Sequence, residues 1–179
     1  EKNPEIVHIS SDNPLYPEAI RKYFADTSLP SIAAIGNLNI LQNKKLAFLC
    51  SVRCPGDIIL QAYDLAHALR DAGITVTSGF HSPLEKEVLN ILLRSPHPVI
   101  ASSARSIEGM RRPTDYKKPL ANGRLLLLSS FNKKISRATV ETSALRNQFI
   151  AAMAENIFVA YTSPGSKTEQ LCKDMLQSG

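Results

Sequence analysis

The sequence predicts an α/β fold: a doubly wound parallel sheet of the extended Rossmann-like kind, with helices on both faces. Short runs that are apolar throughout, such as 46–50 and 125–128, are typical of strands buried on both faces. Segments with apolar residues every three or four positions, such as 58–69, are typical of helices that bury one face. Because the two patterns alternate along the chain, right-handed parallel crossovers are favoured.

The first 45 residues differ in pattern from the rest. Pro14, Pro17 and Pro30 interrupt them, and one short helix is predicted over 17–25, where Pro17 suits a first helical turn. We therefore expect residues 1–45 to form an N-terminal lead-in that packs on the core, and residues 46–179 to form the core domain.

From residue 46 onward, strands and helices are predicted in turn. A strand over 46–50, a helix over 58–69 and a strand over 74–77 make one strand–helix–strand unit. The remaining elements are a helix over 84–93, strands over 98–101 and 124–128, a helix over 139–154, a strand over 157–160 and a helix over 167–176. Residues 102–123 break the pattern, and we expect a long, basic and largely irregular connection there.

Composition narrows the class of protein. With 179 residues, 44% of them hydrophobic and 21% charged, the chain fits one globular domain and excludes disordered or collagen-like classes. No apolar run approaches the roughly 18 residues of a membrane span, and no secretory signal is visible. Cys50, Cys54 and Cys172 lack the grouping of a zinc site, and we expect packing roles for the first two. We expect a reduced, cytoplasmic protein that needs no metal and no cofactor and contacts no membrane.

The net charge of +5 is unevenly distributed. Between Arg105 and Arg146, ten Lys and Arg residues stand against three acidic ones, which leaves +7 in this block and −2 in the rest. A basic block on a mildly acidic body suits a phosphate-bearing partner. A solvated surface that keeps the protein soluble explains the same charge.

Ligands of open α/β sheets bind where the strands end, in loops that lead into helix N-termini. Five predicted loops lie there: 51–56, 79–84, 102–106, 129–137 and 161–168. In the first, Ser51, Arg53 and backbone amides could hold a phosphate, although Pro55 and Gly56 also suit an ordinary turn.

The second loop offers Gly79, His81 and Ser82 as ligand contacts. His81 has no Asp partner and no nucleophile at motif spacing, so a ligand contact is favoured over catalysis. Ser82 and Glu85 have the spacing of a capping box, which would give them a structural role instead.

Thr162 to Glu169 is the sharpest motif. Its small residues allow close approach of the backbone, and the hydroxyls of Ser166 and Thr168 before a helix favour an anion. The motif is not a Walker A sequence, because the Gly-x-x-x-x-Gly-Lys-Thr spacing is absent. No Gly-x-Gly-x-x-Gly fingerprint follows any predicted strand, which argues against a dinucleotide dehydrogenase. Arg146 and Asn147, early in a helix, could contact a phosphate and a base or could equally tie down a loop.

Six motifs in order along the chain extend this interpretation. They are YPEAI at 16–20, LAFLCSVR at 46–53, AGITVTSGF at 72–80, LLSSF at 127–131, ALRNQFIAAMA at 144–154 and GSKT at 165–168. Together they resemble the DNA-processing protein A family (DprA, also called Smf), whose extended Rossmann domain is related to the nucleotide-binding SLOG and LOG proteins. The chain departs from the family at Cys50, where the family has Gly, and at Pro83 and Glu85, where it has Gly-Ile-Asp.

The resemblance implies a protein that binds single-stranded DNA on a basic surface over the strand ends, without catalysis. It further implies hand-over of the strand to a RecA-type recombinase during DNA uptake or recombination, and a homodimer. The side chains expected to contact phosphates are basic and come from four segments: Arg53, Arg105, Arg146 and Lys167. Ser51, Asn147 and Ser166 would support them. Because this part of the chain has few aromatic residues, binding should be mainly electrostatic.

Two other hypotheses remain open from the sequence. The chain could be a SLOG- or LOG-type nucleotide sensor or nucleotide-cleaving enzyme, with Glu85 or Glu169 as the acid–base residue. Gly165, Ser166 and Thr168 would then surround a phosphate. It could also be a scaffold that has lost its ligand site, a hypothesis that the departures at Cys50 and Pro83 favour.

Overall fold

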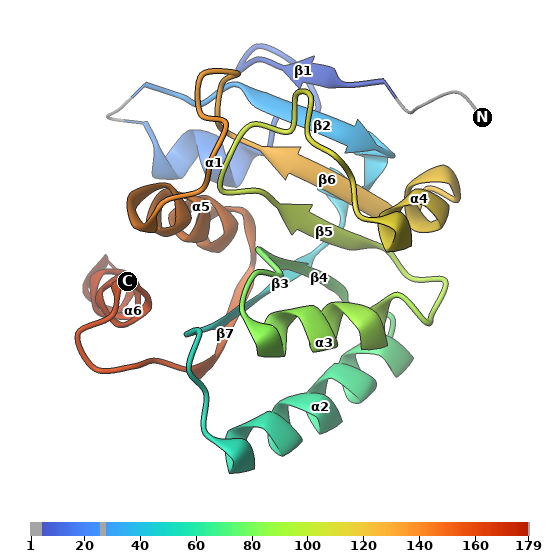
Figure 1. Cartoon of the computed structure of the whole chain (residues 1–179). Helices are drawn as coiled ribbons and strands as arrows, with labels where there is room; N and C mark the ends of the chain where they lie inside the picture. The colour runs from blue at the N-terminus through green and yellow to red at the C-terminus, as the bar shows by residue number, and fades with distance from the viewer. Residues whose placement is uncertain (1–4, 26–27, 179) are drawn as a thin grey trace.

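Seven strands form a single sheet in the computed structural model, which describes residues 5–25 and 28–178 (Figure 1). The strands are β1 (Val7–Ile9), β2 (Ile32–Gly36), β3 (Lys45–Cys50), β4 (Thr75–Ser78), β5 (Val99–Ser102), β6 (Leu125–Ser129) and β7 (Asn156–Tyr161). The helices are α1 (Glu18–Tyr23), α2 (Gly56–Asp71), α3 (Pro83–Leu92), α4 (Thr114–Ala121), α5 (Val140–Met153) and α6 (Lys167–Ser178), with a 3-10 helix, η1, over Leu38–Gln42. The predicted α/β fold is confirmed.

Five strands are parallel to one another, and their order fixes where a ligand can bind. The sheet runs β1-β2-β6-β5-β4-β3-β7, and the pairs from β6 to β7 are all parallel. The chain steps from β3 to β6 in one direction, and α5 then carries it back to β7 on the far side of β3. The strand order therefore reverses between β3 and β7, which is the switch point where sheets of this class bind ligands.

Both faces of the sheet are buried. Along β6, Leu125 and Leu127 pack into one core with α2, α3 and α4, and Leu126 and Leu128 pack into another with α1 and α5. A smaller core lies between β3, α5 and α6. This two-sided burial is the reason that the first four residues of β6 are all leucine.

The N-terminal stretch, expected to be a lead-in packing on the core, contributes β1 and β2 to the same sheet. Both strands are antiparallel to their neighbours: β2 pairs with β6 and β1 with β2. Ile9, Ile20 and Ile32 are fully buried, and the Tyr16 hydroxyl donates a hydrogen bond to the Pro30 carbonyl at 2.9 Å. Residues 1–4 and 26–27 of this stretch lie outside the described residues.

The connection over 102–123, expected to be largely irregular, contains α4. This helix follows Pro113 and includes Pro119 near its end. A proline lacks the N–H that a helix interior needs, but in the last turn of so short a helix it breaks only one hydrogen bond. Burial of Pro119 and Leu120 against the sheet stabilises the helix despite its weak local pattern.

A substitution in β2 tests whether the N-terminal strands are part of the core. Gly36 has φ of +120°, and a Cβ there would lie 2.4 Å from the Leu125 carbonyl oxygen. Because both the backbone conformation and the contact are unfavourable, we expect Gly36→Ala to lower the free energy of unfolding by about 2 kcal/mol or more, measured by denaturant unfolding.

Gly56→Ala is the matched control, because nothing lies within 4 Å of a Cβ at Gly56, the first residue of α2. It should leave stability unchanged or raise it slightly. Equal effects of the two substitutions would contradict the placement of β2 beside β6.

Candidate anion-binding pocket

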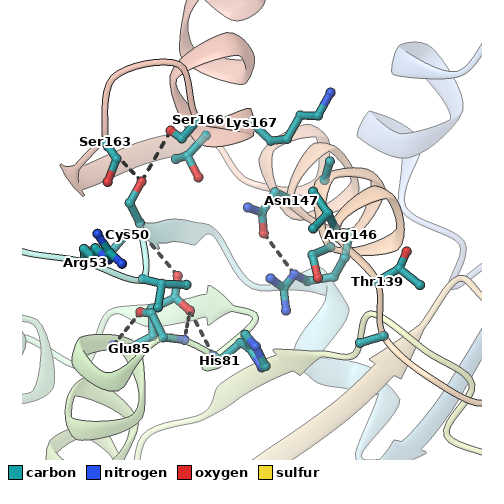
Figure 2. A pocket seen from close by; sticks show the side chains of 18 of the residues that line it. Cys50, Arg53, His81, Glu85, Thr139, Arg146, Asn147, Ser163, Ser166 and Lys167 are labelled. Carbon is teal, nitrogen blue, oxygen red and sulfur yellow. Dashed lines mark hydrogen bonds between the residues drawn. The ribbon is translucent and has the colours of Figure 1, made fainter.

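A pocket of about 850 Å³ opens at the switch point, where β3 and β7 end (Figure 2). Four segments line it: the end of β3, the start of α3, the start of α5 with the residue before its cap, and the loop from β7 into α6. In residue numbers these are 50–53, 81–85, 138–147 and 163–168. The pocket is therefore built from loops that are far apart in sequence but meet at one edge of the sheet.

Three helices begin at the pocket, each with a hydroxyl side chain at its first turn. Ser82 accepts a hydrogen bond from the Glu85 amide, Thr139 from the Thr142 amide, and Ser166 from the Glu169 amide. The first of these is the capping box that the sequence predicted. Three helix N-termini place partial positive charge around one cavity, and this favours an anion there.

Glu85 anchors the floor of the pocket. It is 3% exposed, and its carboxylate accepts three backbone hydrogen bonds, from Cys50 at 3.1 Å, His81 at 2.9 Å and Ser82 at 3.1 Å. These bonds join the end of β3 to the loop after β4, as Figure 2 shows. A buried carboxylate that accepts three backbone hydrogen bonds stabilises the local backbone, and both of its oxygens are occupied by these bonds.

Arg146 extends from α5 toward Glu85 on the other side of the pocket (Figure 2). Its side chain is buried, and its Nε donates a hydrogen bond to the Asn147 Oδ1 at 2.9 Å (Figure 2). Burial lowers the pKa of the Arg146 guanidinium, and the nearby Glu85 opposes that shift. The guanidinium lies against the backbone of Gly79: a Cβ there would come within 2.1 Å of Arg146 Nη1. Only a glycine permits this position of the guanidinium.

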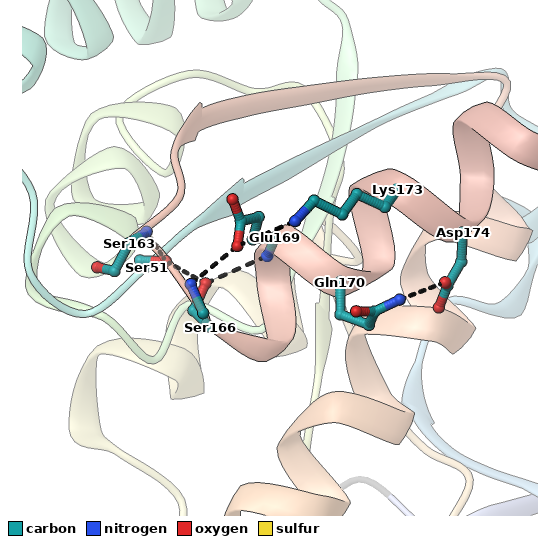
Figure 3. A network of polar contacts seen from close by, with 8 residues as sticks. Ser51, Ser163, Ser166, Glu169, Gln170, Lys173 and Asp174 are labelled. Atoms are coloured by element: carbon teal, nitrogen blue, oxygen red, sulfur yellow. Dashed lines mark hydrogen bonds and ion pairs between the residues drawn. The ribbon is translucent and has the colours of Figure 1, made fainter.

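Hydroxyl groups join the loops after β3 and β7 (Figure 3). The Ser51 Oγ accepts a hydrogen bond from the Ser163 amide at 3.0 Å and lies 3.5 Å from the Ser166 Oγ. Beyond them, the Glu169 carboxylate accepts a hydrogen bond from the Gly165 amide at 2.8 Å, and this bond, with the nearby Lys173, lowers the pKa of Glu169. The loop between β7 and α6 is thus fixed by polar contacts with Ser51 and with Glu169.

Most of the residues predicted from the sequence come together at this pocket. Ten of the twelve line it: Ser51, Arg53, His81, Ser82, Arg146, Asn147, Gly165, Ser166, Lys167 and Thr168. Gly79 lies beneath the Arg146 guanidinium and is not in the lining. Arg105 lies outside the pocket, and its guanidinium donates to the Ser136 carbonyl at 3.1 Å.

The sequence did not single out the wall formed by the first turns of α5. Thr139, Val140, Ser143 and Ala144 line the pocket there, together with Ala138. One feature of the sequence indicates this wall: a helix is predicted to begin at 139, directly after a loop at the carboxyl edge of the sheet.

The pocket's chemistry is that of anion binding. Arg53 and Lys167 are exposed at the pocket, and Arg146 is buried within it. Burial and the neighbouring Cys54 raise the pKa of the Cys50 thiol to about 12, so it is protonated at neutral pH and is a poor nucleophile. Among the residues that the structure describes, no group of three potential metal ligands occurs. Over the same residues, no helix is both long and apolar enough to span a bilayer.

The two carboxylates considered for acid–base catalysis, Glu85 and Glu169, both make structural contacts. Both oxygens of Glu85 accept backbone hydrogen bonds. Glu169 does not line the pocket, and its Oε2 accepts the Gly165 amide and lies 3.4 Å from the Lys173 ammonium. Neither geometry offers a carboxylate aimed at a ligand in the pocket.

The fold is that of a Rossmann-like α/β protein, and its candidate anion-binding pocket lies at the switch point of the sheet. Within that class, the chain belongs to the family described as DNA recombination-mediator protein A, whose family model matches residues 7–168. A search of curated proteins finds no match.

Two solved structures have the same fold. DNA processing protein A (DprA) from Streptococcus pneumoniae matches with a TM-score of 0.79 and 18% identity, over 97% of this chain and 60% of that one. DNA processing protein A from Helicobacter pylori, whose structure is described as showing a unique single-stranded DNA binding mode, matches with a TM-score of 0.74 and 16% identity, over 94% of this chain and 75% of that one. The chain thus spans about three fifths of the S. pneumoniae protein.

The hydrogen bonds of Glu85 can be tested by an isosteric substitution. In Glu85→Gln, the amide nitrogen cannot accept the backbone N–H groups that now bind a carboxylate oxygen. We expect a loss of about 1.5–3 kcal/mol in the free energy of unfolding, measured with denaturant. Glu87→Gln is the control, because Glu87 is exposed on the same helix; it should change stability little. Equal, small effects of both substitutions would contradict an anchoring role for Glu85.

Proposed function

We propose that this chain binds single-stranded DNA through the pocket at the ends of β3 and β7, with the phosphate backbone as the main contact and without catalysis. The observation that supports this most directly is the buried guanidinium of Arg146. A guanidinium has five N–H donors, and within the described residues its one hydrogen-bond acceptor is Asn147. The four N–H groups of its Nη atoms are left for a ligand, and a phosphate accepts two of them at once.

The family and one structural relative support the choice of DNA. The chain belongs to the DNA recombination-mediator family, and the H. pylori relative is described as binding single-stranded DNA. Arg53 lies on the loop after β3, and Lys167 is the first residue of α6, which follows β7, so phosphates could be bound along the opening as well as within it.

Among the described residues that line the pocket, none is Phe, Tyr or Trp, and His81 alone has an aromatic ring. Stacking on aromatic rings is the usual way to hold bases of single strands, so this pocket would hold the backbone and tolerate any sequence. Binding would then be steeply dependent on salt, because each neutralised phosphate releases counterions.

Two partners, a recombinase and a second copy of the chain, are proposed from family membership alone. As a recombination mediator in the cytoplasm, the chain would pass its strand to a RecA-type recombinase and would act as a homodimer. Both partners can be tested with the purified chain, the first by co-sedimentation on DNA and the second by light scattering.

Arg146→Ala tests the central contact. We expect the affinity for a labelled single-stranded oligonucleotide, measured by fluorescence anisotropy, to fall at least about tenfold, because a charge-assisted bidentate contact is lost. The melting temperature should change little, because the guanidinium makes one hydrogen bond within the protein and its burial is costly. A collapsed melt would support a purely structural role instead.

Arg94→Ala is the matched control for that experiment. Arg94 is exposed just beyond the end of α3, whereas the pocket lies at the start of that helix. Arg94→Ala removes the same charge as Arg146→Ala and should leave the affinity for the oligonucleotide nearly unchanged. Equal losses in both variants would contradict a specific role for Arg146.

Gly79→Ala tests the position of the guanidinium without removing it. The new Cβ would displace the flexible end of the Arg146 side chain, so we expect weaker oligonucleotide binding with the fold retained. In the Arg146→Ala background the same change should have almost no further effect on binding, because the group it displaces is gone. Additive effects of the two substitutions would show that Gly79 acts through something other than Arg146.

A further inference from the structure

The side chains that line the pocket at the ends of β3 and β7 carry a net charge of +2 when histidine is neutral. Three of them are cations and one is a carboxylate: Arg53, Arg146, Lys167 and Glu85. Both oxygens of Glu85 accept backbone hydrogen bonds, and Glu141, which lies near Lys167, is not in the lining. An internal phosphodiester of a nucleic acid carries one negative charge, whereas a phosphate held by a single ester bond carries about −1.5 to −2 at pH 7. The charge of the lining therefore matches a phosphomonoester better than a phosphodiester.

Hydrogen-bond donors without an acceptor in the described protein come from two helices of the pocket. Asn147 accepts the Arg146 Nε at its Oδ1, and the Asn147 Nδ2 and both Nη atoms of Arg146 donate to no described residue. At the start of α6, the backbone N–H groups of Lys167 and Thr168 likewise find no acceptor among the described residues. All four residues line the pocket. A phosphomonoester presents three terminal oxygens to such donors, one more than a phosphodiester, whose second ester bond uses an oxygen.

The burial of Arg146 limits what can reach its free donors. The residue is 6% exposed, and its guanidinium lies against the backbone of Gly79 (Figure 2). A phosphate that binds the Nη atoms therefore has to enter the pocket. An internal phosphate would bring a nucleotide on each side with it, whereas a terminal phosphate brings one. The cavity of about 850 Å³ has the size of a pocket for a single small ligand, which suits one end of a strand.

We propose that the pocket binds the terminal phosphate of a single strand, the phosphomonoester at its 5′ or 3′ end. This inference rests on the proposed function and narrows the ligand of the same site. Arg146, Asn147 and the first amides of α6 would bind the terminal phosphate, and Arg53 at the opening would bind a phosphodiester that follows it. The chain would thus recognise phosphorylated strand ends through charge and donor number, without reading bases.

The test compares thymidine strands that differ only at their ends. The first has about 12 nucleotides, within the usual site sizes of single-strand binders, and a 5′-phosphate. The second has hydroxyl ends and is one nucleotide longer, so that both strands contain the same number of phosphates. The third has the length of the first, but its 5′-phosphate carries a methyl ester and therefore a single charge. A 3′-phosphorylated strand distinguishes the two ends, and thymidine monophosphate tests a free nucleotide. All are unlabelled competitors of one labelled strand, measured by fluorescence anisotropy at low and at physiological salt.

With the unaltered chain, we expect a strand phosphorylated at one of its two ends to bind at least about tenfold more tightly than the longer strand with hydroxyl ends, because additional charge-assisted hydrogen bonds form. If the preferred end is the 5′ end, the methyl ester should remove this preference; if it is the 3′ end, a 3′ methyl ester should do so. Thymidine monophosphate should compete more weakly than the phosphorylated strand, because it lacks the phosphodiester that Arg53 would bind. Equal binding by phosphorylated strands and the hydroxyl-ended strand would overturn the inference. So would a monophosphate that competes as well as the phosphorylated strand, because the pocket would then bind a free nucleotide.

Two variants assign the preference to the pocket. In Arg146→Ala, phosphorylated and hydroxyl-ended strands should bind within about twofold of each other, whereas Arg94→Ala should keep the preference of the unaltered chain. Loss of the preference in both variants would overturn the assignment to this pocket. The comparison of strands with the unaltered chain does not depend on the folding of either variant.

Failure of the inference and failure of the proposed function give different results. If the strands bind equally well whatever their ends, and Arg146→Ala weakens all of them alike, the pocket binds internal phosphates and the inference is wrong while the proposed function stands. If the unaltered chain binds none of the strands at low salt, the proposed function itself is wrong, and the inference falls with it.

Discussion

The arrangement of the pocket depends on one buried carboxylate. Glu85 sits at the third position of α3, yet it holds the end of β3 through the Cys50 amide as well as its own helix cap through His81 and Ser82. Burying a carboxylate is costly unless hydrogen bonds replace its water shell, and three backbone donors do so here. Because one donor ends β3 and the other two lie in the loop after β4, satisfying the charge fixes these two segments relative to each other.

The charge on Glu85 also explains how an arginine can be buried nearby. A guanidinium removed from water loses solvation, which favours its neutral form, and the field of Glu85 opposes this. Asn147 then orients the group through Nε, and Gly79 leaves space for it. An acid, an amide and a glycine from three elements thus surround one buried cation that lines the pocket.

Fold and site differ in how far the sequence predicts them. Continuous apolar runs predict the parallel core, because two-sided burial demands them, and the loops of the site follow from where those strands end. β1 buries Ile9 alone and so gives no apolar run, whereas β2 is an apolar run like those of the core but lies in a proline-interrupted stretch that we expected to be a lead-in. The capping spacing of Ser82 and Glu85 is local and was predicted, whereas the bond from Glu85 to Cys50 and the approach of Arg146 to Gly79 depend on the tertiary fold.

The position of Arg105 shows why loops at one edge of a sheet do not all share one site. It follows β5, and β4 lies between β5 and β3. Adjacent strands are about 4.8 Å apart, so β5 ends about 10 Å from β3. The segment after β6 reaches the lining because it continues into α5, whereas Arg105 bonds to the Ser136 carbonyl outside the pocket. The spacing between adjacent strands also bears on the kind of ligand that suits this edge of the sheet. Under the proposed function, successive phosphates of a bound strand are separated by several ångströms, which is the scale on which neighbouring strands of the sheet space the loops at this edge.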